Sequence, residues 1–199
     1  MTHWSTPKRM LLGVAAPLLL ALTACTSLGA TGNKGYISGD GSVQVIDPAD
    51  RDDPVTFSGT SLTGDPISSE DYLGKVLVVN KWWSGCGPCR TEMPMLGEVS
   101  PELGDRAAVL GINVRDSSPE NGLSFMKRVG ADFPSVYDVQ GKVGLAFAGK
   151  APMAATPTTI FLDDEGRVAA VITGPVPSKQ TLLDVIDDVA GDDGGNSDG

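Results

Sequence analysis

A short segment, Trp82–Arg90, constrains the fold of this chain more than any other part of its sequence. It reads Trp-Trp-Ser-Gly-Cys-Gly-Pro-Cys-Arg and follows an apolar run, Val76–Val79, that is typical of a buried strand. A helix beginning near Cys89 would place Cys86 at its first turn, where unpaired N–H groups and the helix dipole favour a thiolate. The segment therefore predicts a strand, a turn and a helix that carry two thiols one helical turn apart, the layout of a reversible dithiol/disulfide pair.

The N-terminus has the features of an export signal. Lys8 and Arg9 precede an apolar stretch, residues 10–22, that is too short to cross a membrane comfortably. The stretch is closed by Leu-Thr-Ala-Cys, which ends at Cys25 and resembles a bacterial lipobox. That resemblance implies cleavage of a lipoprotein signal peptide, residues 1–24, and attachment of lipid such as palmitate to Cys25. The alternatives are an uncleaved signal anchor and an ordinary secretory signal. We expect a lipid-anchored protein on the extracytoplasmic face of the cell membrane.

Charge and cysteine content agree with an exported protein. The 199-residue chain has a formal charge of −10, and loss of Lys8 and Arg9 with the signal would take it to −12. An acidic chain without a basic patch is a poor candidate for binding nucleic acid. With Cys25 attached to lipid, Cys86 and Cys89 are the two remaining cysteines, and disulfides persist outside the cytoplasm.

The dithiol segment does not fit the common cysteine-containing cofactor sites. A c-type haem site requires a histidine where this chain has Arg90, and the single histidine, His3, lies in the signal. Two cysteines also leave a four-coordinate zinc site half filled. A peroxidatic cysteine of the peroxiredoxin type would need a proline and threonine frame, which Trp83–Gly85 does not supply. We therefore expect neither a metal nor a cofactor.

Composition divides the mature chain into three parts. Residues 25–53 are rich in small and polar residues and are expected to form a flexible tether. Residues 54–190 have the length of one domain with a single core. Residues 191–199 have no large apolar residue, so we expect a disordered acidic tail.

Apolar patterning within residues 54–190 predicts alternating strands and helices. Strands are expected at Val55–Ser58, Val76–Trp82, Ala107–Val114, Pro134–Tyr137, Thr158–Leu162 and Val168–Ile172, and helices at Cys89–Glu102, Pro119–Val129, Lys142–Ala148 and Ser178–Ala190. A turn at residues 163–166 should join the last two strands as a hairpin. The pattern indicates an α/β domain with the dithiol at the end of a central strand.

Four motifs in a fixed order resemble the thioredoxin superfamily, and more narrowly its TlpA/ResA-like extracytoplasmic thiol:disulfide oxidoreductases. They are Gly74-Lys75-Val76, Cys86-Gly87-Pro88-Cys89, Glu92-Met93-Pro94 and Thr156-Pro157-Thr158-Thr159. The resemblance implies a thioredoxin-like fold, in which helices flank a central mixed sheet. It also implies that residues 115–155 contain the helix and strand that this branch inserts and that they shape substrate specificity.

The resemblance further implies a role for each site residue. Cys86 would be the exposed nucleophile, and Cys89 would resolve the mixed disulfide. Pro157 would be cis, which would place the Thr156 backbone beside Cys86 for pairing with an extended substrate. A trans proline at the start of a strand is the alternative. Glu92, one turn after Cys89, would be partly buried and would exchange a proton with it. The alternative is a solvated glutamate that stabilises the helix dipole.

Three residues depart from the family pattern. Many members have a tryptophan where this chain has Gly85, and the additional aromatic residue here is Trp83. Lys81 replaces a common phenylalanine. If the Lys81 ammonium were partly buried close to the helix start, it would lower the pKa of Cys86. We favour the alternative, in which the stem of Lys81 covers the sheet and its head reaches water, with little effect on that pKa. Asn80 replaces the buried aspartate of thioredoxin, which leaves Glu92 as the proton acceptor.

We expect a membrane-tethered thiol:disulfide oxidoreductase whose substrates are protein thiols and disulfides. The Gly87-Pro88 dipeptide matches thioredoxin, a reductant, so we favour reduction of protein disulfides. By resemblance, a membrane electron donor of the CcdA type would re-reduce the dithiol, and apocytochrome c is a candidate substrate. One alternative is a thiol oxidase that promotes disulfide formation in exported proteins. The other is a non-enzymatic lipoprotein with a structural disulfide, although so short a loop contributes little stability.

Overall fold

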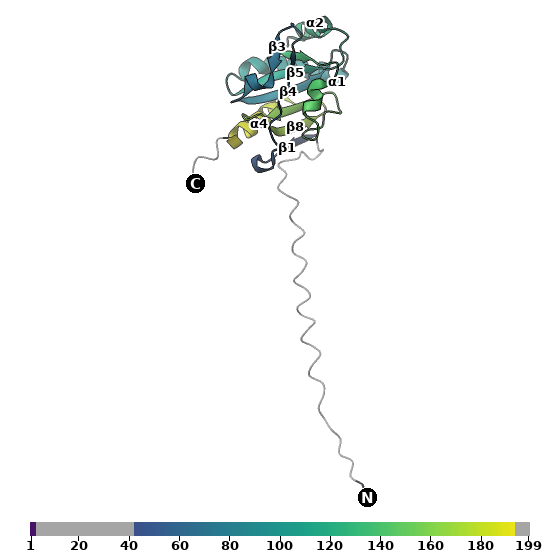
Figure 1. The fold of residues 1–199 in the computed structure, drawn as a ribbon, viewed down its shortest axis with the longest axis vertical. Coiled ribbons are helices and arrows are strands. Elements are labelled where there is room, and N and C mark those ends of the chain that lie inside the picture. Colours follow the sequence, from purple (N-terminus) through teal and green to yellow (C-terminus); the bar gives the residue numbers. More distant parts are fainter. Residues whose placement is uncertain (3–41, 194–199) are drawn as a thin grey trace. The chain divides into compact units, whose positions relative to one another are not determined.

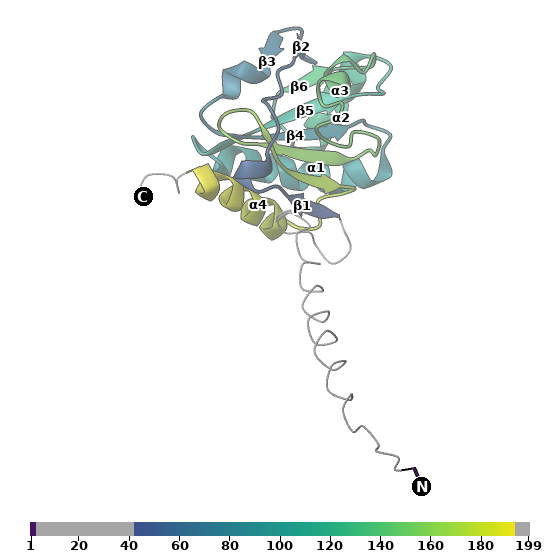
Figure 2. The same cartoon turned by 60° about the horizontal axis from the view of Figure 1, so that its bottom comes forward.

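The computed structural model describes residues 1–2 and 42–193, and residues 42–193 contain every element discussed below. Their main sheet has six strands in the order β1-β8-β7-β4-β5-β6 (Figures 1 and 2). The strands are β1 (Val43–Val45), β4 (Val76–Trp82), β5 (Ala107–Asn113), β6 (Ser135–Tyr137), β7 (Thr158–Leu162) and β8 (Val168–Thr173). β4 lies parallel to β5 and antiparallel to β7, so the sheet is mixed, as expected.

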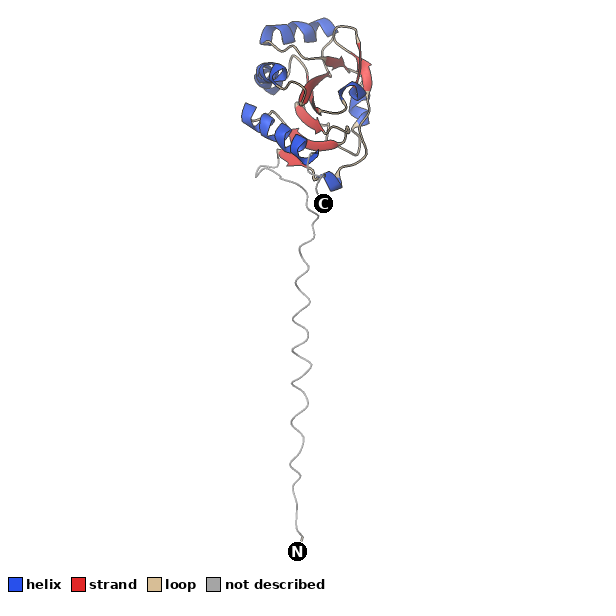
Figure 3. Ribbon diagram, turned by 90° about the vertical axis from the view of Figure 1, so that its left-hand side faces the viewer, coloured by secondary structure: helices blue, strands red, loops and turns tan. Residues whose placement is uncertain are grey.

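The continuous apolar run in β4 is explained by helices and loops on both faces of the sheet. Figure 3 shows helices on either side. Val76 and Val78 pack with residues of α1 (Gly87–Val99), α2 (Pro119–Val129) and α4 (Lys179–Asp193). Leu77 and Val79 face the other side, where they join a cluster with α3 (Lys142–Ala146). Because alternate residues point to opposite faces, a strand covered on both sides is apolar throughout.

Most predicted elements are confirmed to within a few residues. β4, β7 and α2 have the predicted bounds, and the hairpin of β7 and β8 is present. The strand predicted at Val55–Ser58 is wrong. The chain there is irregular until β2 (Ser58–Thr60), which pairs with β3 (Pro66–Ser68), a strand that the sequence did not predict. Val55 and Phe57 are apolar because their side chains enter the core, not because they pair in a strand.

The folded domain begins before residue 54, where the sequence analysis placed its boundary. β1 pairs with β8 in the register Val43 to Ile172. Arg51 Nη1 lies 3.1 Å from Asp163 Oδ2, and both side chains are fully buried. Part of the predicted tether is therefore structural, because edge pairing and a buried ion pair fix it. At the other end, α4 continues to residue 193, so residues 191–193 of the predicted tail are helical.

Residues 115–155, predicted to form an insert, contribute α2, β6 and α3. β6 extends the sheet by pairing in parallel with β5. Within residues 42–193, no helix combines the length and hydropathy needed to cross a bilayer. The predicted signal peptide and Cys25 lie outside the described residues.

Candidate active site

The two cysteines form a disulfide at the start of α1. Cys86 is the N-cap residue and Cys89 lies in the first turn, with their Cα atoms 5.2 Å apart. The N–H of Cys89 donates to Cys86 Sγ over 3.2 Å. Cys86 is 6% exposed and Cys89 is completely buried. A partner sulfur therefore reaches Cys86 first, which is the order that the predicted nucleophile and resolving cysteine require.

The loop before β7 faces the dithiol. The carbonyl oxygen of Thr156 lies 3.8 Å from Cys86 Sγ, and the Thr156–Pro157 peptide bond is cis, as the resemblance implied. The hydroxyl of Thr158 donates to the carbonyl oxygen of Ala155 over 3.1 Å, which ties the loop to the start of β7. The Thr156 backbone is thus beside the sulfur where the predicted pairing with a substrate strand would occur.

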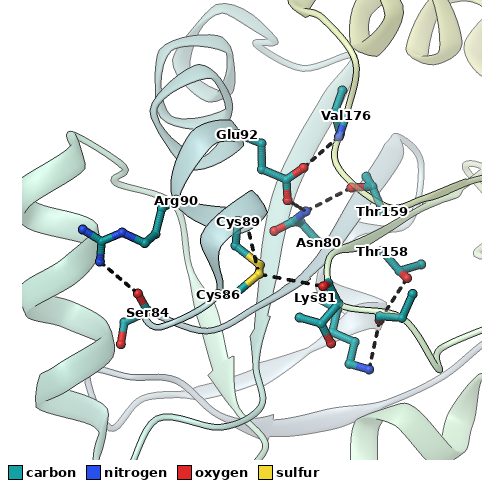
Figure 4. The surroundings of a disulfide bond; sticks show 12 residues. Asn80, Lys81, Ser84, Cys86, Cys89, Arg90, Glu92, Thr158, Thr159 and Val176 are labelled. Atoms are coloured by element: carbon teal, nitrogen blue, oxygen red, sulfur yellow. Dashed lines mark hydrogen bonds between the residues drawn. A yellow bond between two sulfur atoms is a disulfide. The ribbon is translucent and has the colours of Figure 1, made fainter.

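Glu92 is buried, so the solvated alternative is wrong. Its side chain is 3% exposed, and its two carboxyl oxygens accept from Asn80 Nδ2 over 3.0 Å and from the N–H of Val176 over 2.8 Å (Figure 4). Burial raises the pKa of Glu92, and these two hydrogen bonds oppose part of that rise. Because Glu92 lies three residues after Cys89 on α1, it faces the same side of the helix. The site thus holds a carboxyl group suited to exchange a proton near the buried sulfur.

Asn80 connects Glu92 to the sheet. Its Nδ2 also donates to the hydroxyl of Thr159 over 3.0 Å, so one amide bridges β4, α1 and β7. Its Oδ1 is buried and has no hydrogen-bond partner in the part of the chain that the structure describes. The aspartate of thioredoxin is therefore replaced here by a neutral amide that orients the Glu92 carboxyl.

The Lys81 side chain points away from the dithiol, and its ammonium is bonded to a loop in addition to the solvated position that the sequence predicts (Figure 4). It points to the face of the sheet opposite Asn80, because neighbouring residues of a strand alternate. Its Nζ donates to the carbonyl oxygens of Met153 and of Ala155, the latter over 3.2 Å. Burial, and secondarily the charge of Arg115, lower the pKa of Lys81. Lys81 therefore fixes the loop that leads to Pro157.

Trp83 fills the space left by the absence of a side chain at Gly85. A Cβ added to Gly85 would lie 2.1 Å from Cζ3 of Trp83. The Trp83 ring therefore occupies the space beside residue 85, where many family members have their tryptophan. Glycine at this position allows the indole to cover the loop in front of Cys86.

Asp116 is a site residue that the sequence analysis missed. Its buried carboxylate accepts hydrogen bonds from the N–H of Ser84 over 3.1 Å, from the Ser84 hydroxyl and from Asn113 Nδ2 over 2.6 Å. Arg90 Nη1 adds a bond to the Ser84 carbonyl oxygen over 3.2 Å. The available signal was topological, since an acidic residue after β5 lies at the same sheet edge as the turn after its parallel neighbour β4.

The chemistry available to this site is thiol–disulfide exchange. Cys86 keeps a small exposed fraction, Cys89 is completely buried one turn away, and a carboxyl group with a raised pKa lies on the same helix. No group of three or more potential metal-ligating side chains is found in residues 42–193.

Comparisons with known proteins agree with this chemistry. The model of the Redoxin family matches residues 49–186. A thiol-disulfide oxidoreductase ResA from Bacillus thuringiensis subsp. konkukian (strain 97-27) is 26% identical over 163 residues, which are 82% of this chain and 89% of the relative.

Two solved structures are also similar. A DsbF homologue from Corynebacterium diphtheriae is 38% identical with a TM-score of 0.69, and the match covers 78% of this chain and 98% of that one. A secreted thiol-disulfide isomerase from Corynebacterium glutamicum is 32% identical with a TM-score of 0.70, covering 79% and 97%. The alternative of a non-enzymatic lipoprotein is therefore set aside. The chain belongs to the Redoxin family, and it is a thioredoxin-fold thiol-disulfide oxidoreductase of the ResA type built around the Cys86–Cys89 pair.

Proposed function

We propose that this oxidoreductase reduces disulfides in exported proteins on the extracytoplasmic face of the cell membrane, to which a lipid on Cys25 tethers it. The Cys86 thiolate attacks a substrate disulfide, a Cys86–substrate bond forms, and the departing substrate sulfur takes up a proton. Cys89 then loses its proton and attacks Cys86, which releases the second substrate thiol. Two electrons pass to the substrate, and the Cys86–Cys89 pair is left oxidised.

The contacts of Cys86 Sγ are the observation that favours reduction of substrates over their oxidation. Strong oxidants of this fold have a reduced form whose thiolate is unusually stabilised. In the disulfide, and among the described residues, this sulfur accepts from the N–H of Cys89 and lies beside the carbonyl oxygen of Thr156. Two cations of the surrounding segments bond to other groups: Lys81 donates to the loop before Pro157, and Arg90 donates to the Ser84 carbonyl oxygen. Modest stabilisation of the thiolate favours a reductant.

Glu92 supports the same direction. A negatively charged Glu92 beside the buried sulfur would disfavour the Cys89 thiolate by charge repulsion, so Cys89 would keep its proton in the reduced pair. A protonated Glu92 would supply that proton when the pair is re-reduced. Because burial raises the pKa of Glu92, its carboxylate is a stronger base than that of an exposed glutamate, which suits it to take up the proton of Cys89. Glu92 would accept the Cys89 proton as that cysteine resolves the mixed disulfide, and return it on re-reduction.

A reductant outside the cytoplasm needs a source of electrons. We propose a membrane donor of the CcdA type, and apocytochrome c as one protein substrate, on the resemblance to the TlpA/ResA-like branch. The ResA name of the Bacillus relative agrees with that branch.

Oxidation or isomerisation of exported proteins is the second candidate. It is favoured by the names of the two corynebacterial structures, a DsbF homologue and a secreted thiol-disulfide isomerase. The two candidates differ in the reduction potential that they require.

The potential of the Cys86–Cys89 pair tests the direction. Equilibration with glutathione should give a reduction potential of about −270 mV, in the range of thioredoxin. A potential of about −120 mV would assign the protein to the oxidases. The reduced protein should also cleave insulin disulfides. Labelling of cells with palmitate tests the tether, because label should enter the native protein and not Cys25→Ser. Equal labelling of both would remove lipid anchoring at Cys25 from the proposal.

A further inference from the structure

A groove beside the active site has features that the redox chemistry leaves unexplained. Its cavity of about 530 Å³ lies next to the loop that Lys81 fixes. We call it the Arg115 groove. Its walls include Lys81, Arg115, Asp138, Val139, Leu145 and Met153. Figure 4 shows the Lys81 side chain pointing away from the disulfide, and its ammonium donates to the carbonyl oxygens of Met153 and Ala155. The same loop carries the Thr156 carbonyl oxygen, 3.8 Å from Cys86 Sγ.

Topology places the Arg115 groove at the same edge of the sheet as the dithiol. β4, β5 and β6 are parallel neighbours, so their carboxyl ends meet at one edge. Cys86 follows β4, Arg115 follows β5 and Val139 follows β6. Met153, another wall residue, precedes Thr156 by three positions. A substrate strand lying along this loop advances about 3.3 Å per residue, so side chains about two to four residues from its cysteine reach the groove.

The groove is positively charged where the rest of the protein is acidic. Lys81 and Arg115 form no ion pair among the described residues, and the charge of Arg115 lowers the pKa of Lys81, so the two cations lie close enough to repel. Asp138 is the only carboxylate among the residues that line the groove, and its oxygens accept from the N–H groups of Lys142, Val143 and Gly144 instead of pairing with either cation. Two cations against one carboxylate leave the groove with a net positive charge. The Lys81 ammonium already donates to the carbonyl oxygens of Met153 and Ala155, so Arg115 is the cation with which an added carboxylate would pair, and Lys81 would add attraction at longer range.

The groove also exposes apolar side chains. Leu145 is 73% exposed and Val139 is 47% exposed, which places them among the few large apolar side chains that the described residues leave in solvent. An occupant that matches both features has an acidic side chain next to an apolar one.

We propose that the Arg115 groove binds an acidic side chain with an apolar neighbour, located a few residues from the reactive cysteine of a protein substrate. This inference rests on the proposed exchange with protein disulfides, for which it names the recognised sequence. The overall charge of −10 disfavours acidic partners as a whole, so the groove selects a local feature within a substrate whose net charge is not strongly negative.

Paired peptides test this recognition. Each peptide carries one cysteine as a mixed disulfide with glutathione, a leucine, and either Asp or Asn at position two, three or four from the cysteine. The full chain in detergent, carrying Cys25→Ser throughout, is reduced and mixed with an equimolar peptide pair. Mass spectrometry after acid quenching gives the ratio of the two released peptide thiols in a single turnover. We expect Asp to be preferred about fivefold at one position, and the preference should weaken in high salt.

Two matched pairs of variants locate the effect. Arg115→Gln should reduce the Asp preference to less than about twofold, whereas Lys127→Gln removes an exposed positive charge from α2, outside the groove, and should retain it. Leu145→Ser should slow exchange with the Asp peptide about threefold. Leu73→Ser, which alters another exposed leucine outside the groove, should not.

Three outcomes would overturn the inference. Equal rates for the Asp and Asn peptides at all positions would show that the groove does not recognise an acidic side chain. Equal losses of preference in Arg115→Gln and Lys127→Gln would show that overall charge decides. A dimer in analytical ultracentrifugation that Leu145→Ser dissociates would assign the groove to a second copy of the chain. Failure of the proposed function is distinguishable, because the unsubstituted protein would then exchange with neither the peptides nor oxidised glutathione.

Discussion

Glu92 and Val176 are separated by 84 positions in the sequence, yet the N–H of Val176 donates to Glu92 Oε2 over 2.8 Å. The other carboxyl oxygen accepts from Asn80, so the buried acid is held between α1, β4 and the segment that joins β8 to α4. The group beside the resolving cysteine is thus controlled by parts of the chain that lie far from the dithiol in the sequence.

Glu92→Gln should change the pH dependence of Cys89. The substitution removes a negative charge one helical turn from that sulfur, so its thiolate should form at lower pH. The rate of Cys89 alkylation against pH, measured in Cys86→Ser and in the double variant, reports the shift. An exposed glutamate of the same helix gives a control, because Glu98→Gln should leave the profile in place. Superimposable profiles with and without Glu92 would restrict this residue to a structural role.

Glu92 should also make folding stability depend on pH. Burial raises its pKa in the folded state above the ordinary value of 4.5, so the folded protein binds this proton more tightly than the unfolded chain. The contribution is fully present below pH 4.5 and is lost as pH rises through the folded-state pKa. The difference in free energy of unfolding between the native protein and Glu92→Gln, measured in urea from pH 4 to 8, should follow this course. A difference that is constant with pH would contradict it.

Lys81→Met should loosen the loop before Pro157. The variant keeps an apolar stem but leaves the carbonyl oxygens of Met153 and Ala155 without the ammonium donor, which should cost about 1–3 kcal/mol of stability. Displacement of the loop that faces Cys86 should slow insulin reduction about tenfold. Lys150 is a matched control, because its Nζ also donates to two carbonyl oxygens but lies exposed away from the dithiol.

Lys150→Met should lose less stability, since water can replace its contacts, and its rate of insulin reduction should stay close to that of the native protein. If both variants lost activity equally, the loss would reflect general destabilisation rather than the loop beside Cys86.

Asp116→Asn should weaken the support of the loop before the dithiol. An amide has one acceptor oxygen where the carboxylate has two, so part of the hydrogen bonding from Ser84 and Asn113 is lost, at a cost of about 1–3 kcal/mol. Removal of a buried negative charge near the helix start should also stabilise the Cys86 thiolate and make the pair more oxidising. Equilibration with glutathione measures this shift. Asp132→Asn, an exposed charge, should leave the potential in place, and equal shifts in both variants would refute a local effect.

A chain beginning at residue 54 should be much less stable than one beginning at residue 42. The shorter chain lacks β1 and Arg51, which leaves the buried Asp163 with the partly exposed Arg167 as its remaining ion-pair partner among the described residues. Breaking a buried pair in this way costs about 3–5 kcal/mol, which urea unfolding would detect. Equal stability of the two chains would show that residues 42–53 do not stabilise the folded domain and belong to the tether.

The sequence alone determined those features that depend on local pattern. The valine run before Cys86, the position of Pro88 and the spacing of the cysteines specify a strand, a turn and a helix, since each signal acts over a few residues. Resemblance then implied the cis Pro157 and the buried Glu92, and the structure has both. β3 and the pairing of β1 escaped prediction because short edge strands have weak patterns and are fixed by partners far along the chain.

Tertiary structure decided the surroundings of the dithiol. Strand alternation fixes the face on which Lys81 lies, but only the folded loop supplies the carbonyl oxygens that hold its ammonium. The bond from Val176 to Glu92 uses a backbone N–H, which every residue except proline has and which therefore leaves no signature in the sequence. Asp116 reaches Ser84 because two parallel strands end at one edge. The sequence specified which two sulfurs react. Contacts between distant segments decided which charged groups and which loop lie around those sulfurs, and these surroundings determine their reactivity.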